Sequence, residues 1–366
     1  MSTSNNIDPS PSHTMNDLLY TSLAKNLKII QNSLGHSNDI IIRKITIGET
    51  EPHHLAIISI DGLSDKTTIS DSVIDKLMAN IEEEQDIEIT TINEYVRNSY
   101  LTVGDVKNIE HFKTLYQAIL NGETVILLDG FAEGIVTSTR SAKDRAVTEP
   151  STESVIRGPR ESFTETLRTN TALIRRKIKS PNLWIKSRII GDVTQTDVAV
   201  MYINGIANDK IVAEVLARLD RINIDGILES GYIEDFIQDS KNTMFPTIYN
   251  SERPDVIAGE LLDGKIAILV DGTPFVLVVP ALFTSFLQSA EDYYQHWMIS
   301  SLIRILRFLG ISLALVAPSL YVAITTFHQE MLPTPMLISI ASQREGVPFP
   351  AVVEALIMEI AFEVLR

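Results

Sequence analysis

The strongest hydrophobic signal along the chain is a run of 20 uncharged residues at positions 308–327. At a rise of about 1.5 Å per residue, a helix of that length spans about 30 Å, the thickness of a bilayer's hydrocarbon core. Pro318 lies inside the run and is tolerated in membrane helices. Arg304 and Arg307 precede the run, and Glu330 follows it. The pattern predicts a membrane-spanning helix behind a cytosolic N-terminal domain, and the alternative is a buried core helix of a soluble protein.

Apolar segments that end in Asp-Gly or Asn-Gly recur in the region before that run. Three pairs of segments resemble each other in the same order: residues 55–62 with 198–205, 92–96 with 233–237, and 125–130 with 267–272. The offsets between the members of these pairs are 143, 141 and 142 residues. A nearly constant offset between segments in the same order indicates an internal duplication.

Each copy predicts the same order of elements. A strand that ends at the Asp-Gly or Asn-Gly pair is followed by a helix, at residues 69–81 or 210–219, because apolar residues recur there at helical spacing. A short strand, a second helix near Ile92 or Ile233 and a closing hairpin complete each copy, and the Asp-Gly pairs supply the hairpin turns.

The expected fold class is therefore α/β: two duplicated mixed α/β subdomains followed by a partial α-helical transmembrane domain. We expect five regions: a disordered or weakly ordered N-terminal tail at 1–38, a first subdomain at 39–140, a basic linker and helix at 141–182, a second subdomain at 183–290, and the membrane domain at 291–366.

The expected linker is basic in an acidic protein. Residues 141–188 contain 11 Lys or Arg and 5 Asp or Glu, whereas the formal net charge of the chain is −16. Ser162 is a candidate cap for a helix that begins near Phe163 and ends before Pro181, with its basic residues mainly off the apolar stripe. The candidates for contact with a neighbouring subunit, or with anionic headgroups, are Arg157, Gly158, Pro159, Arg160, Arg175 and Arg176. The alternative is that they pair with acidic surface on the chain's own subdomains.

A second apolar helix, predicted from residue 351 onward, carries three glutamates. Carboxylates at membrane depth usually face a bundle interior or a water path, so Glu354, Glu359 and Glu363 are candidates for an ion pathway. Glu359 and Glu363 share a face, whereas Glu354 lies about 140° away from Glu359. Alternatively, the helix lies at the interface and its glutamates pair with arginines. Because the chain stops inside this apolar helix, we expect that further spans follow in a longer protein.

Several classes of chemistry are unsupported by the sequence. The chain has no cysteine, which excludes disulfides and thiolate ligands, and its acidic balance argues against nucleic acid as a partner. We find no glycine-rich phosphate loop and no combination of nucleophile and base. We therefore predict that the protein is not an enzyme and has no catalytic residue, cofactor or metal site.

Motifs in the second half of the chain carry a resemblance to a known family. They are residues 155–163 (VIRGPRESF), 167–170 (LRTN), 173–179 (LIRRKIK), 267–274 (AILVDGTP), 291–294 (EDYY), 318–323 (PSLYVA), 325–328 (TTFH), 332–335 (LPTP) and 344–350 (REGVPFP). In this order they resemble the A subunit of bacterial spore germinant receptors, the GerA family of spore germination proteins. The match runs from about residue 140 to 366 and rests before that on the duplicated pattern.

The resemblance implies a protein of the spore inner membrane that acts in a nutrient germinant receptor. It implies a transporter-like B subunit and a lipoprotein C subunit as partners, and coupling of nutrient sensing to ion release during germination. It also implies that the subunit forms a homo-oligomer and forms or gates an ion pathway. The alternatives are a direct small-molecule sensor, acting through the duplicated cytosolic domain, and a secondary transporter.

Overall fold

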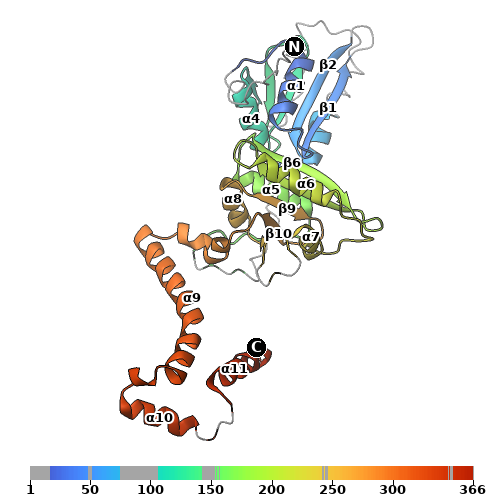
Figure 1. Ribbon diagram of the computed structural model, residues 1–366. Helices are drawn as coiled ribbons and strands as arrows, with labels where there is room; N and C mark the ends of the chain where they lie inside the picture. Colours follow the sequence, from blue (N-terminus) through green and yellow to red (C-terminus); the bar gives the residue numbers. More distant parts are fainter. Residues whose placement is uncertain are drawn as a thin grey trace, which may run out of the picture. The chain divides into compact units, whose positions relative to one another are not determined.

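The computed structural model describes residues 17–47, 52–74, 106–141, 153, 155, 157–240, 243, 246–344, 346 and 349–365 (Figure 1). The chain divides into two compact units, Met1–Ser285 and Phe286–Arg366. The second unit therefore begins five residues before the expected boundary at 291. The helix expected near Ile92 and the first 16 residues of the expected tail lie outside the described residues.

The first subdomain is one antiparallel sheet with two helices on one face. Its elements are α1 (Leu23–Ser33), β1 (Ile40–Ile47), β2 (His53–Ile60), a π-helical segment (Thr68–Ile74), β3 (Val106–Ile109), α4 (Phe112–Leu120), β4 (Thr124–Leu128) and β5 (Gly134–Thr137). The strand order is β1-β2-β4-β5-β3. Side chains along β2 alternate between the two faces of the sheet, and both faces are apolar. Ala56 and Ile58 join the hydrophobic cluster under α1 and α4, while Leu55 and Ile57 join the cluster on the opposite face.

The second subdomain repeats this architecture. Its elements are α5 (Leu167–Lys177), β6 (Leu183–Ile190), β7 (Thr196–Ile203), α6 (Asp209–Leu219), α7 (Ser230–Ile237), β8 (Tyr249–Ser251), α8 (Pro254–Leu262), β9 (Ile266–Val270) and β10 (Val276–Val279). The strand order β6-β7-β9-β10-β8 matches that of the first sheet position by position. Ala199 and Met201 on β7 pack with α5 and α8, and Val198 and Val200 pack with α6 and α7. The fold class and the duplication predicted from the sequence are confirmed.

The repeated unit begins earlier than the sequence suggested, with a helix in front of the first strand. The backbone N–H of Leu23, at the start of α1, donates to Asp129 Oδ1 over 2.8 Å, and that of Leu167, at the start of α5, donates to Asp271 Oδ1 over 2.9 Å. One turn later, the side chain of Asn26 exchanges two hydrogen bonds with the backbone of Tyr20. The matching contacts of Leu23 with Asp129 and of Leu167 with Asp271 identify α1 and α5 as equivalent helices, offset by 144 residues.

Two expected region boundaries are therefore wrong. Residues 23–33 are not part of a weakly ordered tail, because Leu23, Leu27 and Ile30 of α1 are buried in the first core. Residues 167–177 are not a linker helix, because α5 is the first helix of the second repeat. Both helices have only 11 residues, so they depend on tertiary packing rather than on their own helix propensity.

Smaller expectations also need correction. The helix expected to begin near Phe163 is α5, which begins at Leu167 with Thr166 as N-cap. The hydroxyl of Ser162 instead donates to the backbone oxygen of Glu252. No strand lies between α6 and α7, where residues 220–229 are all described. Instead, the backbone oxygens of Ile224 and Asp225 in that segment accept hydrogen bonds from backbone N–H groups in the turn between β6 and β7. The donors are the N–H groups of Asp192 and Val193.

The second unit is helical. It contains η4 (Ala290–Tyr293), α9 (Trp297–Thr326), η5 (Gln329–Met331), α10 (Thr334–Arg344) and α11 (Ala351–Leu365), preceded by η3 (Phe283–Leu287) at the boundary. Among the described residues, α9 is the one helix long and apolar enough to cross a membrane, with a mean hydropathy of 2.0 in its most apolar window. Only 6% of that window is buried, so α9 is not a core helix of the described chain.

Candidate functional site

The two subdomains are joined by a buried ion pair. Arg175 on α5 donates from Nε to Asp39 Oδ2 over 2.7 Å and from Nη2 to Asp39 Oδ1 over 3.0 Å. Its Nη1 donates to the backbone oxygen of Leu183 over 2.8 Å. The Arg175 side chain is 0% exposed and that of Asp39 is 9% exposed. A bidentate guanidinium–carboxylate contact fixes both position and orientation, so this pair holds α5 against the start of β1.

A second ionic contact lies about two turns earlier on the same face of α5. Asp61, just after β2, is buried and pairs with Arg168 on α5 and with Lys66. The next residue, Gly62, has φ +84°, and a Cβ there would lie 3.1 Å from the backbone oxygen of Arg168 and 3.0 Å from the Cβ of Ala172. The helix of the second subdomain thus packs directly on backbone of the first, and Ala172 belongs to the first subdomain's core cluster.

The edge strand of the second sheet completes this interface. The backbone N–H of Ile185 donates to Ser37 Oγ over 3.0 Å, and that of Ser187 donates to Asn38 Oδ1 over 3.2 Å. These side chains come from the loop between α1 and β1 and satisfy donors on the free edge of β6. The indole of Trp184 lies over Gly35 and donates to the backbone oxygen of Ser33 over 3.3 Å.

Residues 153 and 157–163 lie along the second subdomain near α8. Arg253, which precedes α8, is 2% exposed on its side chain and pairs with Asp255 over 2.7 Å. It also donates to the backbone oxygens of Glu153 and Pro159, each over 3.4 Å. Burial raises the pKa of Glu153 above its ordinary value, although the Ser251 hydroxyl donates to this carboxylate over 2.8 Å and opposes the shift.

The structure separates the six predicted subunit-contact residues. Arg157, Gly158 and Arg160 are exposed, and Pro159 and Arg176 are half-buried. Arg175 is the exception: it is fully enclosed and bound to Asp39, so it is unavailable to a neighbouring subunit. Periodicity had placed Arg175 off the apolar stripe of its helix, but it had not shown that another subdomain covers that face.

The arginines before the apolar run are anchored to one carboxylate. Asp292 accepts hydrogen bonds from Arg304 Nε over 3.2 Å and from Arg307 Nη1 over 2.9 Å. Burial alone raises the pKa of Asp292, but the hydrogen bonds from Arg307 and Arg304 outweigh it and hold this pKa below its ordinary value. Arg307 also donates to the backbone oxygen of Leu287 over 2.7 Å. The segment before α9 is thereby fixed to the first turns of the helix.

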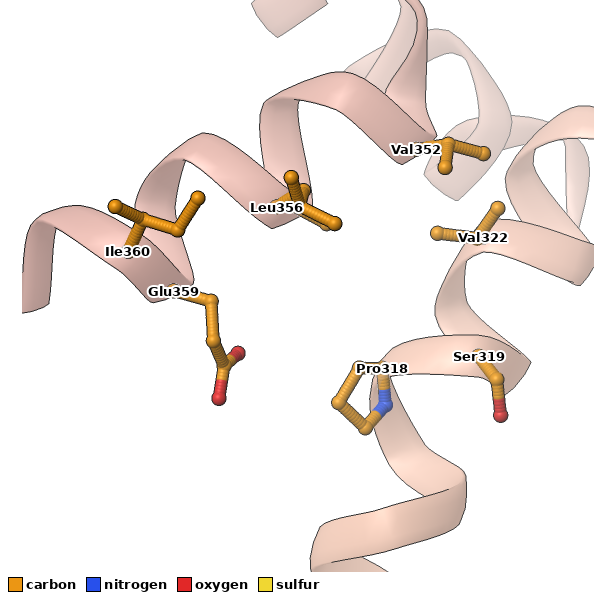
Figure 2. A pocket seen from close by; sticks show the side chains of 8 residues that line it. Pro318, Ser319, Val322, Val352, Leu356, Glu359 and Ile360 are labelled. Carbon is orange, nitrogen blue, oxygen red and sulfur yellow. The ribbon is translucent and has the colours of Figure 1, made fainter. Parts of the chain in front are cut away.

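An apolar groove lies between α9 and α11, with a volume of about 540 Å³. Pro318, Ser319 and Val322 line it from α9, and Val352, Ala355, Leu356, Glu359 and Ile360 line it from α11. Figure 2 shows the Glu359 side chain pointing into the space between the two helices. Of the three predicted ion-pathway glutamates, Glu359 lines the groove and Glu354 and Glu363 do not.

Comparison with known proteins decides the family. Residues 28–366 match the family described as Bacillus/Clostridium GerA spore germination protein. The chain belongs to the GerA family. The resemblance stated from the motifs is therefore confirmed, and so is the prediction that the chain is not an enzyme, because this is a family of germination proteins.

Curated relatives from Bacillus subtilis (strain 168) cover almost all of this GerA-family chain. Spore germination protein KA is 51% identical over 349 residues, which are 95% of this chain and 63% of that protein. The uncharacterized membrane protein YfkQ is 39% identical, over 94% of this chain and 66% of that protein. Spore germination protein B1 is 38% identical, over 94% of this chain and 70% of that protein. The chain thus spans about two thirds of the length of these relatives.

A solved structure supports the duplicated fold. The chain resembles the crystal structure of the N-terminal domain of the A subunit of the Bacillus megaterium spore germinant receptor GerK3, with 41% sequence identity and a TM-score of 0.59. The similarity covers 73% of this chain and 98% of that one. It is therefore a likeness to a germinant-receptor A subunit in the part that holds the two α/β subdomains.

Sequence reasoning missed two of the carboxylates that organise these contacts. Asp39 meets Arg175, and Asp292 meets Arg304 and Arg307, only in the folded chain. Asp292 had a local signal, because it lies three residues after Ser289 and the two form a capping box. Asp39 had none, since its partner Arg175 is 136 residues away.

Proposed function

We propose that this chain is the A-subunit component of a nutrient germinant receptor that couples nutrient sensing to ion release across the spore inner membrane. The observation that carries the proposal is the match of residues 28–366 to the GerA family. The exposed apolar surface of α9 supports placement in a membrane, because an isolated soluble protein rarely exposes so large an apolar patch.

The receptor partners in this proposal are a transporter-like B subunit and a lipoprotein C subunit. The two α/β subdomains lie on the cytosolic side, which agrees with Arg304 and Arg307 on the N-terminal side of the apolar run. Asp292 neutralises part of that charge, but one positive charge remains in excess among these three residues. The exposed Arg157 and Arg160 and the half-buried Arg176 provide contacts to neighbouring subunits.

The subunit oligomerises and forms or gates an ion pathway in this proposal, with Glu359 as the leading pathway residue. Its carboxylate lines a groove whose other walls are almost entirely apolar. A carboxylate at membrane depth is costly unless it meets water, a cation or another polar group, and rings of acidic side chains are a common way to select cations. Pro318, inside α9 on the opposite wall, marks the place where this helix lacks one backbone donor.

The decisive experiment is ion flux through vesicles that contain the full chain, with and without its partner subunits. We expect nutrient-dependent cation flux only when the partners are present, and we expect Glu359→Gln to alter the flux. Flux that is independent of the chain contradicts the proposal. Nutrient binding that maps by NMR to residues between the two subdomains would instead favour a direct sensor.

A further inference from the structure

The two subdomains of one chain contact each other head to tail, and this leaves one half of the same contact unused on each subdomain. The first subdomain contributes what we call the loop face: the loop between α1 and β1 and the Asp61-Gly62 turn. The second contributes the helix face: α5 and the edge strand β6. Because the subdomains are repeats, the first also carries a helix face, α1 and β1, and the second also carries a loop face, residues 180–182 and 204–205.

The unused helix face is open in this structure. On α5, Ala172 and Arg175 are 5% and 0% exposed because the first subdomain covers them. Their equivalents on α1, offset by 144 residues, are Lys28 and Gln31, and both are exposed. The difference in burial between the two helices therefore arises from the docked partner and not from the helix itself.

The unused loop face is open at Gly205. Gly62 packs against α5, whereas its equivalent Gly205 has the same backbone conformation, φ +85°, with nothing within 4 Å of a Cβ placed there. Asn182 is equivalent to Asp39, because the N–H of Asn204 donates to its backbone oxygen just as that of Asp61 donates to Asp39. The Asn182 side chain is half-buried, and its Oδ1, which solvent does not reach, accepts no hydrogen bond from the described residues.

The residues at the two unused faces differ from the used ones in a complementary way. The used contact joins a carboxylate, Asp39, to a guanidinium, Arg175. At the unused faces the corresponding residues are Asn182 and Gln31, two neutral carboxamides. If only one of these two positions differed from the charged pair, a charge would face an amide. Here both positions differ, and both side chains are neutral.

We propose that the helix face of one copy docks on the loop face of a second copy, repeating between chains the contact that joins the subdomains within each chain. This proposal names the partner in the oligomerisation that the proposed function contains, and rests on that function. We expect a second copy of the chain at this surface, because every copy carries both the unused helix face and the unused loop face. The contact is heterologous, so it generates a ring when its rotation closes.

Cross-linking tests the pairing directly, because the natural chain has no cysteine. Full chains carrying Gln31→Cys and full chains carrying Asn182→Cys are co-expressed with tags of different size and treated with a short bismaleimide. We expect cross-linked pairs that contain one chain of each kind, and no pairs when either variant is expressed alone. The control replaces Asn182→Cys by Asp235→Cys, an exposed position on α7, which packs on the opposite face of the second sheet from α5, and we expect no product.

A charge exchange provides the second arm. Gln31→Arg alone or Asn182→Asp alone should weaken self-association about fivefold to tenfold, since each leaves an unmatched charge at the contact. The double variant should restore association to about the natural level, because it recreates the pair seen between the subdomains. Circular dichroism checks that all variants keep their fold.

The outcomes separate this inference from the proposed function. Cross-linking of Gln31→Cys chains with each other, a product with Asp235→Cys, or a double variant no better than the singles overturns the docking contact. If the chains still oligomerise and conduct ions in that case, the proposed function stands and the contact is elsewhere. If the expected cross-links form but no ion flux is measured, the contact stands and the proposed function does not.

Discussion

Arg175 and Asp39 lie 136 residues apart in the sequence and form a bidentate, almost fully buried ion pair between the two repeats. A buried pair of this kind adds little net stability over apolar residues of similar size, but the loss of one partner is costly. The pair therefore specifies one arrangement of the subdomains.

Replacing Arg175 alone should strongly destabilise the unit formed by the two subdomains. Arg175→Met leaves the Asp39 carboxylate buried without its partner, and we expect a loss of about 3–5 kcal/mol in the free energy of unfolding. Urea denaturation, followed by Trp184 fluorescence in a Trp297→Phe background, measures it. Lys179→Met, which removes an exposed contact to Asn121, should cost about 0.5 kcal/mol or less. Equal effects of the two substitutions would contradict the role of the pair.

Gly35 is expected to be sensitive for a different reason. It has φ +63°, and a Cβ at this position would overlap the Trp184 ring. Gly35→Ala should therefore cost about 2–4 kcal/mol and change the Trp184 emission, through both backbone strain and overpacking. Gly272→Ala is the control: it has φ +91° and open space, so strain alone should cost about 1–2 kcal/mol. An unchanged Trp184 spectrum in Gly35→Ala would refute the packing.

Glu153 should make the attachment of its segment depend on pH. Its folded-state pKa is raised by burial, so its contribution to stability is present below the unfolded pKa of about 4.3 and is lost as the pH rises through the folded pKa. Glu153→Gln should therefore raise the urea midpoint at pH 7 and leave it unchanged near pH 4. Glu161→Gln, at an exposed ion pair with Lys177, should show no such difference between the two pH values.

Asp292 should behave in the opposite sense. Its folded-state pKa is lowered by Arg307 and Arg304 despite burial, so its contribution is present above the unfolded pKa of about 3.9 and is lost as the pH falls through the folded pKa. We expect the base of α9 to be unaffected between pH 8 and 5 and to loosen below about pH 4. Trp297 fluorescence in a Trp184→Phe background reports this change. Asp292→Asn should show the loosened signal already at pH 7, whereas Glu330→Gln should not.

Two glutamates on α11 allow a matched test of the ion pathway. Glu359 lines the groove beside α9, whereas Glu363, one turn later, does not. Charge reversal by Glu359→Lys should lower cation conductance about tenfold or more, because a fixed positive charge in a low-dielectric path repels cations. Glu363→Lys should have the smaller effect. Unchanged ion flux and germination in the Glu359 variant would remove it from the pathway.

The sequence alone determined the features that follow from local pattern. Twenty uncharged residues fix a helix that needs an apolar environment, and strand-forming segments that end in Asp-Gly or Asn-Gly revealed the duplication through their constant offset. These signals are periodic or compositional, so they survive without knowledge of what packs against them. The motifs of residues 155–163 and 318–350 added the family for the same reason.

Only the tertiary structure decided which face of each element is covered. The short helix α1 was hidden because 11 residues carry few apolar positions, and its identity depends on the core that it fills. Arg175 appeared as an exposed basic residue, yet it is buried, because the second repeat docks its helix on the first. Contacts between residues more than a hundred positions apart leave no trace in local spacing, and the pairing of Arg175 with Asp39 is set by the fold.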